Sequence, residues 1–249
     1  MDYQSIVSQQ EAYEQLKHSL MSNGQIMYAG KLLQRAYTMR PDGIALIYQD
    51  TTITYRQLYG QAAAFARFLR QQGVKPGDCV LMCIDNSPFF YGAYFGIWQA
   101  GAVVAPLNTF LKEHELRHII NDSQAVCIVT QEERLPLFAN TGLATLPPLY
   151  TQKDILEYHE VPAAVYADEP VNRPTHEIAA LLYTSGTTGL PKGVMLSSHN
   201  IMSNMMQAAV RLDVGHNERI FGVLPLFHSF AQNACVWGAV FKGYTVILV

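Results

Sequence analysis

The sequence has 249 residues, of which 49% are hydrophobic and 15% charged, with a formal net charge of -3 at pH 7. This apolar content supports a large buried core and excludes a disordered or fibrous chain. Because there is no basic excess to hold a phosphate backbone, we expect no nucleic acid as a partner.

Strand and helix signals alternate along most of the chain. Short apolar runs predict strands at residues 44–48, 79–84, 102–105, 125–130, 178–183, 219–224 and 245–249. Helices are predicted between them, at residues 54–73, 88–100, 112–121, 198–212 and 229–242. Strands separated by helix-length segments indicate βαβ units, so the predicted fold class is α/β with mainly parallel sheets and helices on both faces.

Residues 86–111 have no charged side chain and are long enough to cross a bilayer. They include Gly92 and Gly96, a spacing found where membrane helices pair. The Ser-Pro step at residues 87–88, however, is typical of a helix start, and Gly101 of a helix end. We therefore expect a buried helix followed by a short strand, and no transmembrane segment.

The pattern weakens at residues 132–175, where several prolines interrupt it. We interpret this stretch as an irregular connection and as the seam between two packed subdomains. At the other end, residues 245–249 form an apolar strand with no cap, turn or polar tail after it. We therefore expect the chain to be part of a longer polypeptide.

The strongest chemical signal is YTSGTTGLPKG at residues 183–193, directly after an apolar strand. Its glycines allow a sharp turn that points backbone N–H groups at an anion. Its hydroxyl groups and Lys192 add hydrogen-bond donors and a positive charge. The spacing differs from GxxxxGK[ST] and from GxGxxG. These residue types favour a phosphate-binding loop over an ordinary surface loop.

This motif resembles the signature of adenylate-forming (AMP-binding) enzymes, which include acyl-CoA synthetases, peptide-synthetase adenylation domains and luciferases. Three more segments are similar in order and spacing to elements of that superfamily: ITYRQL at residues 53–58, QAGAVVAPLN at residues 99–108 and PLFHSF at residues 225–230. The resemblance begins near Ala29 and implies the two packed subdomains of the adenylate-forming N-terminal domain. The superfamily's later elements, YGxTE, TGD, a hinge and a late lysine, are not found in these residues. The resemblance thus implies that the C-terminal part and the lid domain are absent and that the chain alone is inactive.

The resemblance implies an acid–thiol ligase of the fatty-acid–CoA ligase type. Such an enzyme joins a carboxylic acid to ATP as an acyl-adenylate and then transfers the acyl group to coenzyme A, with Mg²⁺ as cofactor. It assigns the β- and γ-phosphate contacts to Thr184, Ser185, Gly186, Thr187, Thr188, Gly189 and Lys192. Thr184 is also implied as a ligand of Mg²⁺. The alternative of a non-catalytic relative that binds phosphate or acyl ligands stays open.

The resemblance also places an acyl pocket at Phe227, His228 and Trp237. His228 is the implied catalytic residue, with a role in positioning the carboxylate. The PLFHSF segment and the apolar helix after it are most like long-chain fatty-acid–CoA ligases. Peptide-synthetase domains usually carry an aromatic-Asp pair at the position of His228. We therefore expect a fatty or other hydrophobic acid as the substrate.

A second motif, HELRH at residues 114–118, matches the zinc-protease pattern HExxH. His114 and His118 would share one helix face, with Glu115 as general base. Charged neighbours on this segment instead indicate a solvated helix face. No convincing third ligand follows, apart from the acidic pair at residues 132–133. A zinc hydrolase is the weakest of the three hypotheses.

The four cysteines stand singly in apolar runs, at residues 79, 83, 127 and 235. Few and irregularly spaced cysteines are typical of reduced, buried thiols, so a cytoplasmic protein is expected. Residues 1–20 are polar and lack the pattern of a secretory signal. The expected partners are the small molecules ATP, fatty acid and coenzyme A. Peripheral contact with a membrane and a homodimer both stay open.

Overall fold

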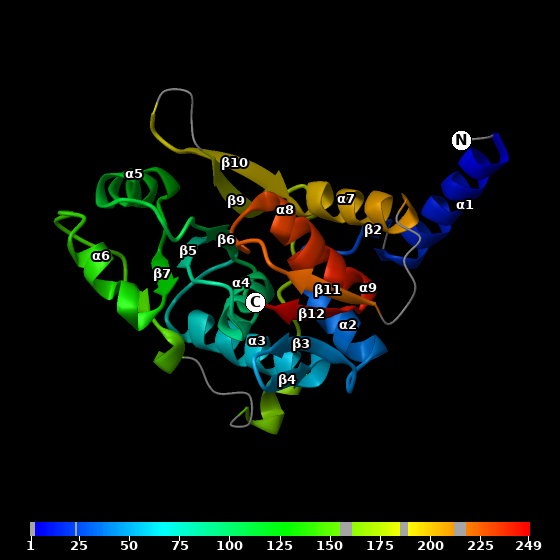
Figure 1. Ribbon diagram of the computed structural model, residues 1–249, viewed down its shortest axis with the longest axis horizontal. Coiled ribbons are helices and arrows are strands. Elements are labelled where there is room, and N and C mark those ends of the chain that lie inside the picture. The colour runs from blue at the N-terminus through cyan, green and yellow to red at the C-terminus, as the bar shows by residue number, and fades with distance from the viewer. Residues whose placement is uncertain (1–2, 23, 155–160, 185–188, 212–217) are drawn as a thin grey trace.

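The computed structural model describes residues 3–22, 24–154, 161–184, 189–211 and 218–249. They form two main β-sheets with helices packed around them (Figure 1), which confirms the predicted α/β fold class. The larger sheet has six strands in the order β10-β9-β6-β5-β7-β8. Its strands are β5 (Cys79–Cys83), β6 (Val103–Pro106), β7 (Cys127–Thr130), β8 (Leu149–Tyr150), β9 (Ile178–Thr184) and β10 (Lys192–Ser197). All neighbours are parallel except β9 and β10.

The second sheet has four strands in the order β11-β12-β3-β4. They are β3 (Ile44–Tyr48), β4 (Thr51–Thr54), β11 (Arg219–Gly222) and β12 (Thr245–Leu248). Both sheets contain strands from before and after residues 132–175. The role of this stretch as the seam between two subdomains stays a prediction. Parallel pairing of β12 with β3 brings residues far apart in the sequence into one sheet.

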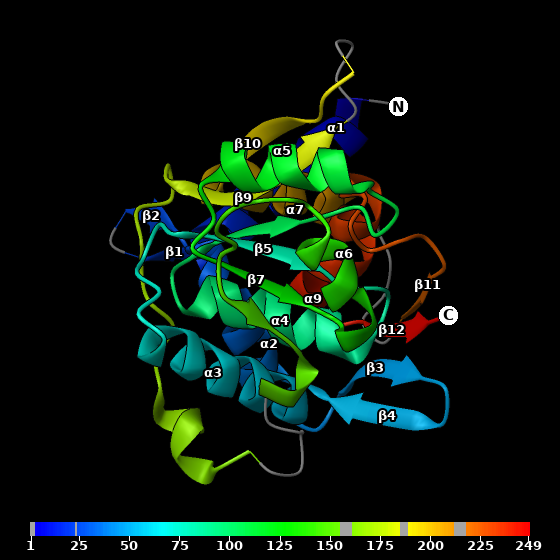
Figure 2. The same ribbon diagram turned by 90° about the vertical axis from the view of Figure 1, so that its left-hand side faces the viewer.

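Helices cover both faces of the six-stranded sheet (Figure 2). The helices are α1 (Tyr3–Ser19), α2 (Leu32–Met39), α3 (Tyr55–Gln71), α4 (Pro88–Gln99), α5 (Glu113–Ser123), α6 (Leu135–Ala139) and α7 (Ser198–Arg211). A last continuous helix comprises α8 (Ser229–Ala231), a π-helical segment (Gln232–Gly238) and α9 (Ala239–Lys242). Short 3₁₀ turns lie at Ala29–Lys31, Glu132–Arg134, Gln152–Asp154 and Ala163–Ala167, and a small hairpin joins β1 (Met21–Ser22) to β2 (Gln25–Ile26).

Side-chain alternation along β5 explains the two covered faces. Val80 and Met82 belong to the large core that contains α3 and α4. Leu81 and Cys83 point the other way, into a smaller core with Leu116 of α5. Because successive side chains of a strand alternate between faces, a strand buried on both sides is apolar throughout.

The uncharged stretch folds as the sequence analysis predicts, with α4 followed by β6. Ser87 caps α4 by accepting a hydrogen bond from the amide of Phe90, and Gly101 follows the helix at φ +78°. Gly96 lets α4 approach α3, because a Cβ there would lie 2.9 Å from the Ala62 carbonyl oxygen. Of the helices in the described ranges, not one has the length and hydropathy that crossing a bilayer requires.

Two further predicted boundaries are confirmed by backbone geometry. Thr54 and Gln57 form both hydrogen bonds of the capping box at the start of α3. Gly243 ends α9 in the left-handed region at φ +72°. Elements that the sequence analysis missed are α1, α2, the β1–β2 hairpin, β4, α6, β8 and β10. β10 was missed because its first residues, Lys192 and Gly193, also belong to the glycine-rich motif.

Candidate active site

The glycine-rich motif forms an antiparallel hairpin at one edge of the six-stranded sheet. Thr184 ends β9 and lies directly opposite Lys192, the first residue of β10. Because β9 is parallel to β6, Thr184 marks the carboxyl end of a parallel strand, where α/β folds bind ligands. The predicted phosphate contacts at residues 185–188 lie outside the described residues.

The described parts of the motif are accessible. Thr184, Gly189 and Lys192 are all exposed. Directly opposed residues of an antiparallel pair project on the same face, so the Thr184 hydroxyl and the Lys192 ammonium share one side of the hairpin. Gly189 has φ +88°, a conformation that favours glycine. A hydroxyl donor and a cation are thus brought together at the loop's two ends.

Helix α5 contacts the hairpin beside both ends of the loop. His118 Nε2 lies 2.9 Å from the carbonyl oxygen of Pro191, the residue before β10. A carbonyl can only accept, so Nε2 carries the proton and donates. On the other side, the Tyr183 hydroxyl donates to Asp122 Oδ2 at 2.7 Å. Neither contact was expected from the sequence, because they join segments about sixty and seventy residues apart.

The HELRH segment lies on this helix. His114 is exposed, whereas His118 directs its Nε2 at Pro191. Glu115 accepts a hydrogen bond from the Lys112 amide and so caps the start of α5. Within the described ranges no cluster of three or more His, Cys, Asp or Glu side chains has a metal-binding arrangement. The contacts seen here give His118 and Glu115 structural roles.

His228 lies in a tight turn before α8. Its side chain is exposed, and its ring centroid lies 4.4 Å from that of Phe227, which is half-buried. Its amide donates to the Pro225 carbonyl at 3.0 Å, and its carbonyl accepts from the Gln232 amide at 2.9 Å. The turn therefore presents the imidazole to solvent while its backbone is tied to the helix.

Gln232 connects this turn to the protein core. It is fully buried, donates from Nε2 to the Phe227 carbonyl at 2.8 Å and accepts from the Tyr94 hydroxyl at 3.0 Å. The Trp237 indole in turn donates to the Tyr94 hydroxyl at 2.9 Å. Sequence reasoning missed Gln232, although a polar residue within an apolar helix was the available signal. The buried amide fixes the backbone on which His228 stands.

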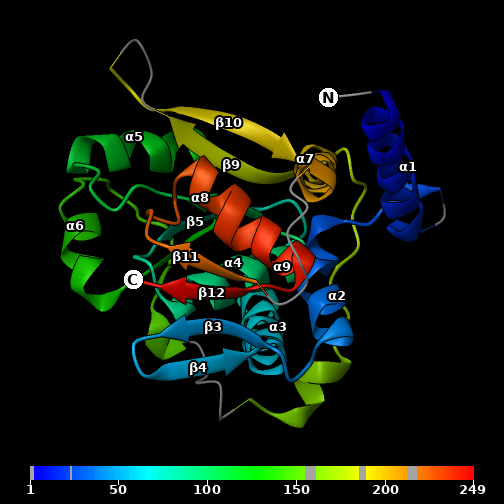
Figure 3. The same cartoon turned by 45° about the vertical axis from the view of Figure 1, so that its right-hand side comes forward.

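Trp237 lies in the protein core, and its place in an acyl pocket stays a prediction. Its side chain is 3% exposed and stacks on Trp98 of α4, with ring centroids 6.2 Å apart. A cavity of about 420 Å³ lies on another side of the same helix, between α7, β11 and α9. Its apolar lining includes Met205, Ala209, Phe230, Ala234 and Phe241. The helix after PLFHSF lines this cavity through Ala234 and Phe241, while Trp237 packs in the core. Figure 3 shows the course of this helix from α8 to α9, which lies beside α2.

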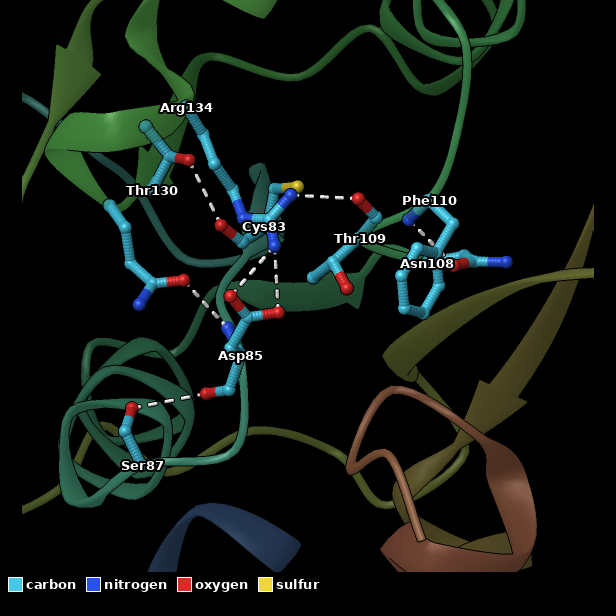
Figure 4. A network of polar contacts seen from close by, with 9 residues as sticks. Cys83, Asp85, Ser87, Asn108, Thr109, Phe110, Thr130 and Arg134 are labelled. Atoms are coloured by element: carbon cyan, nitrogen blue, oxygen red, sulfur yellow. Dashed lines mark hydrogen bonds and ion pairs between the residues drawn. The ribbon is translucent and has the colours of Figure 1, made fainter.

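A polar network crosses the carboxyl ends of the central strands (Figure 4). The Arg134 guanidinium donates to both carboxylate oxygens of Asp85, at 2.8 and 2.7 Å, and to the Thr109 carbonyl at 2.7 Å. Thr130 donates to the Cys83 carbonyl at 2.9 Å. These bonds join the segments that follow β5, β6 and β7. The carboxyl ends of these three central strands are therefore cross-linked, which the sequence analysis did not anticipate.

The buried thiols have strongly shifted acidity. Burial raises the pKa of Cys79 and Cys127 to about 12, and that of Cys83 to about 11. Nearby Asp78 adds to the shift at Cys79 and Cys127. These side chains are therefore protonated at neutral pH. Cys83 and Cys127 are buried, as expected, and Cys79 is half-buried.

Comparison with known proteins places the chain in a family. The model of the AMP-binding enzyme family matches residues 33–249. A feruloyl-CoA synthase from Amycolatopsis sp is 35% identical over 216 residues, covering 86% of this chain and 42% of that protein. A long-chain-fatty-acid–CoA ligase from Bacillus subtilis (strain 168) is 28% identical over 244 residues, covering 84% of this chain and 44% of that protein.

A solved structure agrees with these matches. The inhibitor-bound N-terminal domain of FACL13 from Mycobacterium tuberculosis superimposes with a TM-score of 0.81 at 26% identity, covering 90% of this chain and 57% of that one. The fold is that of an adenylate-forming N-terminal domain. The chain belongs to the AMP-binding enzyme family. It spans less than half the length of these two curated relatives, 42% and 44%.

Proposed function

We propose that this chain carries the pyrophosphate-binding half of an ATP-dependent acid–thiol ligase. The observation that carries the proposal is the β9–β10 hairpin, in which exposed Thr184 and Lys192 pair across the ends of a glycine-rich loop. Family membership supports the reaction class, since the chain matches the AMP-binding enzyme model over residues 33–249.

In the proposed reaction, a carboxylate oxygen attacks the α-phosphorus of ATP and pyrophosphate leaves with the electron pair of the broken P–O bond. Lys192 would neutralise charge that develops on the leaving pyrophosphate, and the loop amides would orient it. A thiol, proposed to be coenzyme A, then attacks the acyl carbon and releases AMP. The protein contributes placement and charge stabilisation.

The described residues fit a Mg²⁺ ion held mainly by phosphate oxygens. Mg²⁺ commonly keeps several waters and takes few protein ligands in nucleotide sites. Thr184 offers one exposed hydroxyl at the end of the loop, which suits a single protein ligand. When bound, the ion would neutralise phosphate charge, while Thr184 would help to orient the phosphates beside Lys192.

We further propose a hydrophobic acid, of the fatty-acid class, as the substrate. The apolar cavity of about 420 Å³ beside the helix that follows His228 supports this choice. His228 stands in the turn before that helix, exposed and held by Gln232, and would position the carboxylate. The relatives include ligases for a feruloyl group and for long-chain fatty acids, both acids with large apolar portions.

A second candidate is binding of phosphate or acyl ligands without turnover. It is favoured by the lack of any YGxTE or TGD segment in these 249 residues. We propose that the 249-residue chain does not complete the reaction by itself. Acyl-CoA formation by the pure chain with ATP, Mg²⁺, palmitate and coenzyme A would contradict this proposal.

Titration of Mg²⁺-pyrophosphate into the chain by calorimetry tests the proposed site. Lys192→Ala should weaken binding about 10- to 100-fold, the value of one hydrogen bond to a charged group. Lys75→Ala, which removes an exposed lysine elsewhere, is the charge-matched control and should leave binding unchanged. Equal affinity of the Lys192→Ala and Lys75→Ala variants would reject the site.

A further inference from the structure

We propose that helix α5 is the support of the phosphate loop, and that His118 and Asp122 are positioning residues that hold its two ends. The inference rests on the proposed function for the identity of the ligand, pyrophosphate. It assigns a role to the HELRH segment, which the proposed reaction does not otherwise use. Neither side chain touches a substrate in this role.

The need for support follows from the topology. β10 is the last strand of the six-stranded sheet and has β9 as its neighbour. Among the described residues, the ladder ends at the pair Thr184 and Lys192. In the described sheet, β10 has no strand on its other side to hold this end of the hairpin. Any rotation of this end would move the Lys192 ammonium away from the phosphates.

His118 holds the returning end of the loop. Its Nε2 donates to the Pro191 carbonyl at 2.9 Å, one residue before Lys192. Pro191 is buried, so loss of this donor would leave its carbonyl without that partner in a site with little water. The backbone immediately before the proposed phosphate-binding lysine is thereby fixed to α5.

Asp122 holds the outgoing end. It accepts from the Tyr183 hydroxyl at 2.7 Å, one residue before Thr184. The Tyr183 ring lies against Gly193 of β10, where a Cβ would be 3.3 Å from Tyr183 Cζ. Burial and the Asp122 carboxylate raise the pKa of Tyr183, so its hydroxyl stays protonated and donates. The ring and the hydrogen bond together join both strands to α5.

The spacing along α5 allows both contacts to be made from the same helix. His118 and Asp122 are four residues apart and therefore share a helix face. Leu116 and Ile119 anchor another face of the same helix in the smaller core. The core packing thus fixes α5, and the hydrogen bonds of His118 and Asp122 hold the two ends of the loop against it. His114 lies one turn earlier and is exposed, which makes it a matched control.

Hydrogen exchange on the intact chain tests the support without relying on any ligand. In His118→Ala, the amides of Gly189, Leu190, Lys192 and Gly193 should exchange about three- to tenfold faster, which corresponds to the loss of one net hydrogen bond. His118→Gln, which keeps a donor, should restore protection, and His114→Ala should match the wild type. Thermal melts of each variant confirm folding. Equal protection in His118→Ala and His114→Ala would overturn the inference.

Tyr183→Phe and Asp122→Asn give a second line of evidence, since they leave His118 intact. Each should speed exchange in the same amides, while Asn121→Ala, at an exposed neighbour, should not. A pair of variants that leaves exchange of residues 189–193 unchanged would overturn the role of Asp122.

Mg²⁺-pyrophosphate titration separates this inference from the proposed function. His118→Ala should bind about three- to tenfold more weakly than wild type, with His118→Gln within about twofold. Wild-type binding that Lys192→Ala weakens and His118→Ala does not would overturn only the positioning role. No binding to the wild-type chain would overturn the proposed function and the identity of the ligand here, whatever the exchange data show.

Discussion

Thr184 and Lys192 face each other as the last pair of the β9–β10 ladder, with seven residues of the motif between them. A hydroxyl and an ammonium group are therefore held on one side of the hairpin, although the loop that joins them is long. This pairing explains how two hydrogen-bond donors, the Thr184 hydroxyl and the Lys192 ammonium group, come to lie together at the two ends of a glycine-rich loop.

The Thr184 hydroxyl should contribute to Mg²⁺-dependent binding. Thr184→Val removes the oxygen and keeps the shape, so we expect the enhancement of pyrophosphate affinity by Mg²⁺ to fall about three- to tenfold. Thr184→Ser should keep most of it. Calorimetry at several Mg²⁺ concentrations measures the effect. A Thr184→Val variant with wild-type Mg²⁺ dependence would exclude the hydroxyl as a ligand.

Gln232 should stabilise the protein as well as the turn at His228. Gln232→Leu leaves the Phe227 carbonyl and the Tyr94 hydroxyl each without one partner, so we expect unfolding to become easier by about 2–4 kcal/mol. His228→Ala, at an exposed side chain, should change stability by less than about 0.5 kcal/mol. Urea denaturation measures both. Equal stability of the two variants would show that the hydrogen bonds of Gln232 do not stabilise the protein.

The apolar cavity, proposed to bind the acyl group, and Trp237 in the core should respond differently to substitution. Ala234→Trp fills the cavity between α7 and α9 and should abolish palmitate binding, measured by calorimetry. Trp237→Phe removes the donor to Tyr94 and should cost about 1–3 kcal/mol of stability with palmitate affinity kept. Loss of palmitate binding in Trp237→Phe alone would return Trp237 to the acyl pocket.

Gly101 and Gly73 both have positive φ, of +78° and +88°, and form a matched pair. A Cβ on Gly101 would lie 2.8 Å from Val171 Cγ1, whereas one on Gly73 would meet nothing within 4 Å. Gly73→Ala should cost only the backbone term of about 1–2 kcal/mol. Gly101→Ala should cost about 1–3 kcal/mol more, because the site is overpacked. Denaturation midpoints that coincide would rule out the steric contribution.

The buried thiols predict a dependence of stability on alkaline pH. The pKa of Cys79 and Cys127 rises from 9.0 to about 12 on folding, so the folded state holds protons that the unfolded state releases. Their contribution is therefore complete below pH 9.0 and is lost progressively as the pH rises to about 12. Denaturation at pH 8 and pH 10.5 measures the loss. A Cys79→Ala, Cys127→Ala double variant should lose less stability between these two values.

Much of the fold could be predicted from local signals. The capping box at Thr54, the Ser87 cap and the glycines after α4 and α9 mark helix ends through interactions within a few residues. Local signals failed at β10, where the motif's glycines concealed a strand. Residues 132–175 carry weaker local signals, and an irregular stretch does not reveal which sheet the flanking strands join.

The candidate site divides in the same way. The sequence by itself determined the glycine-rich motif that we propose binds phosphate, because its glycines, hydroxyls and lysine stand in one run and carry their chemistry locally. Only the tertiary structure decided that His118 faces Pro191, that Gln232 holds the turn at His228 and that Trp237 packs on Trp98. These pairs are brought together by sheet order and helix packing, and the direction of a side chain depends on neighbours that no local pattern specifies.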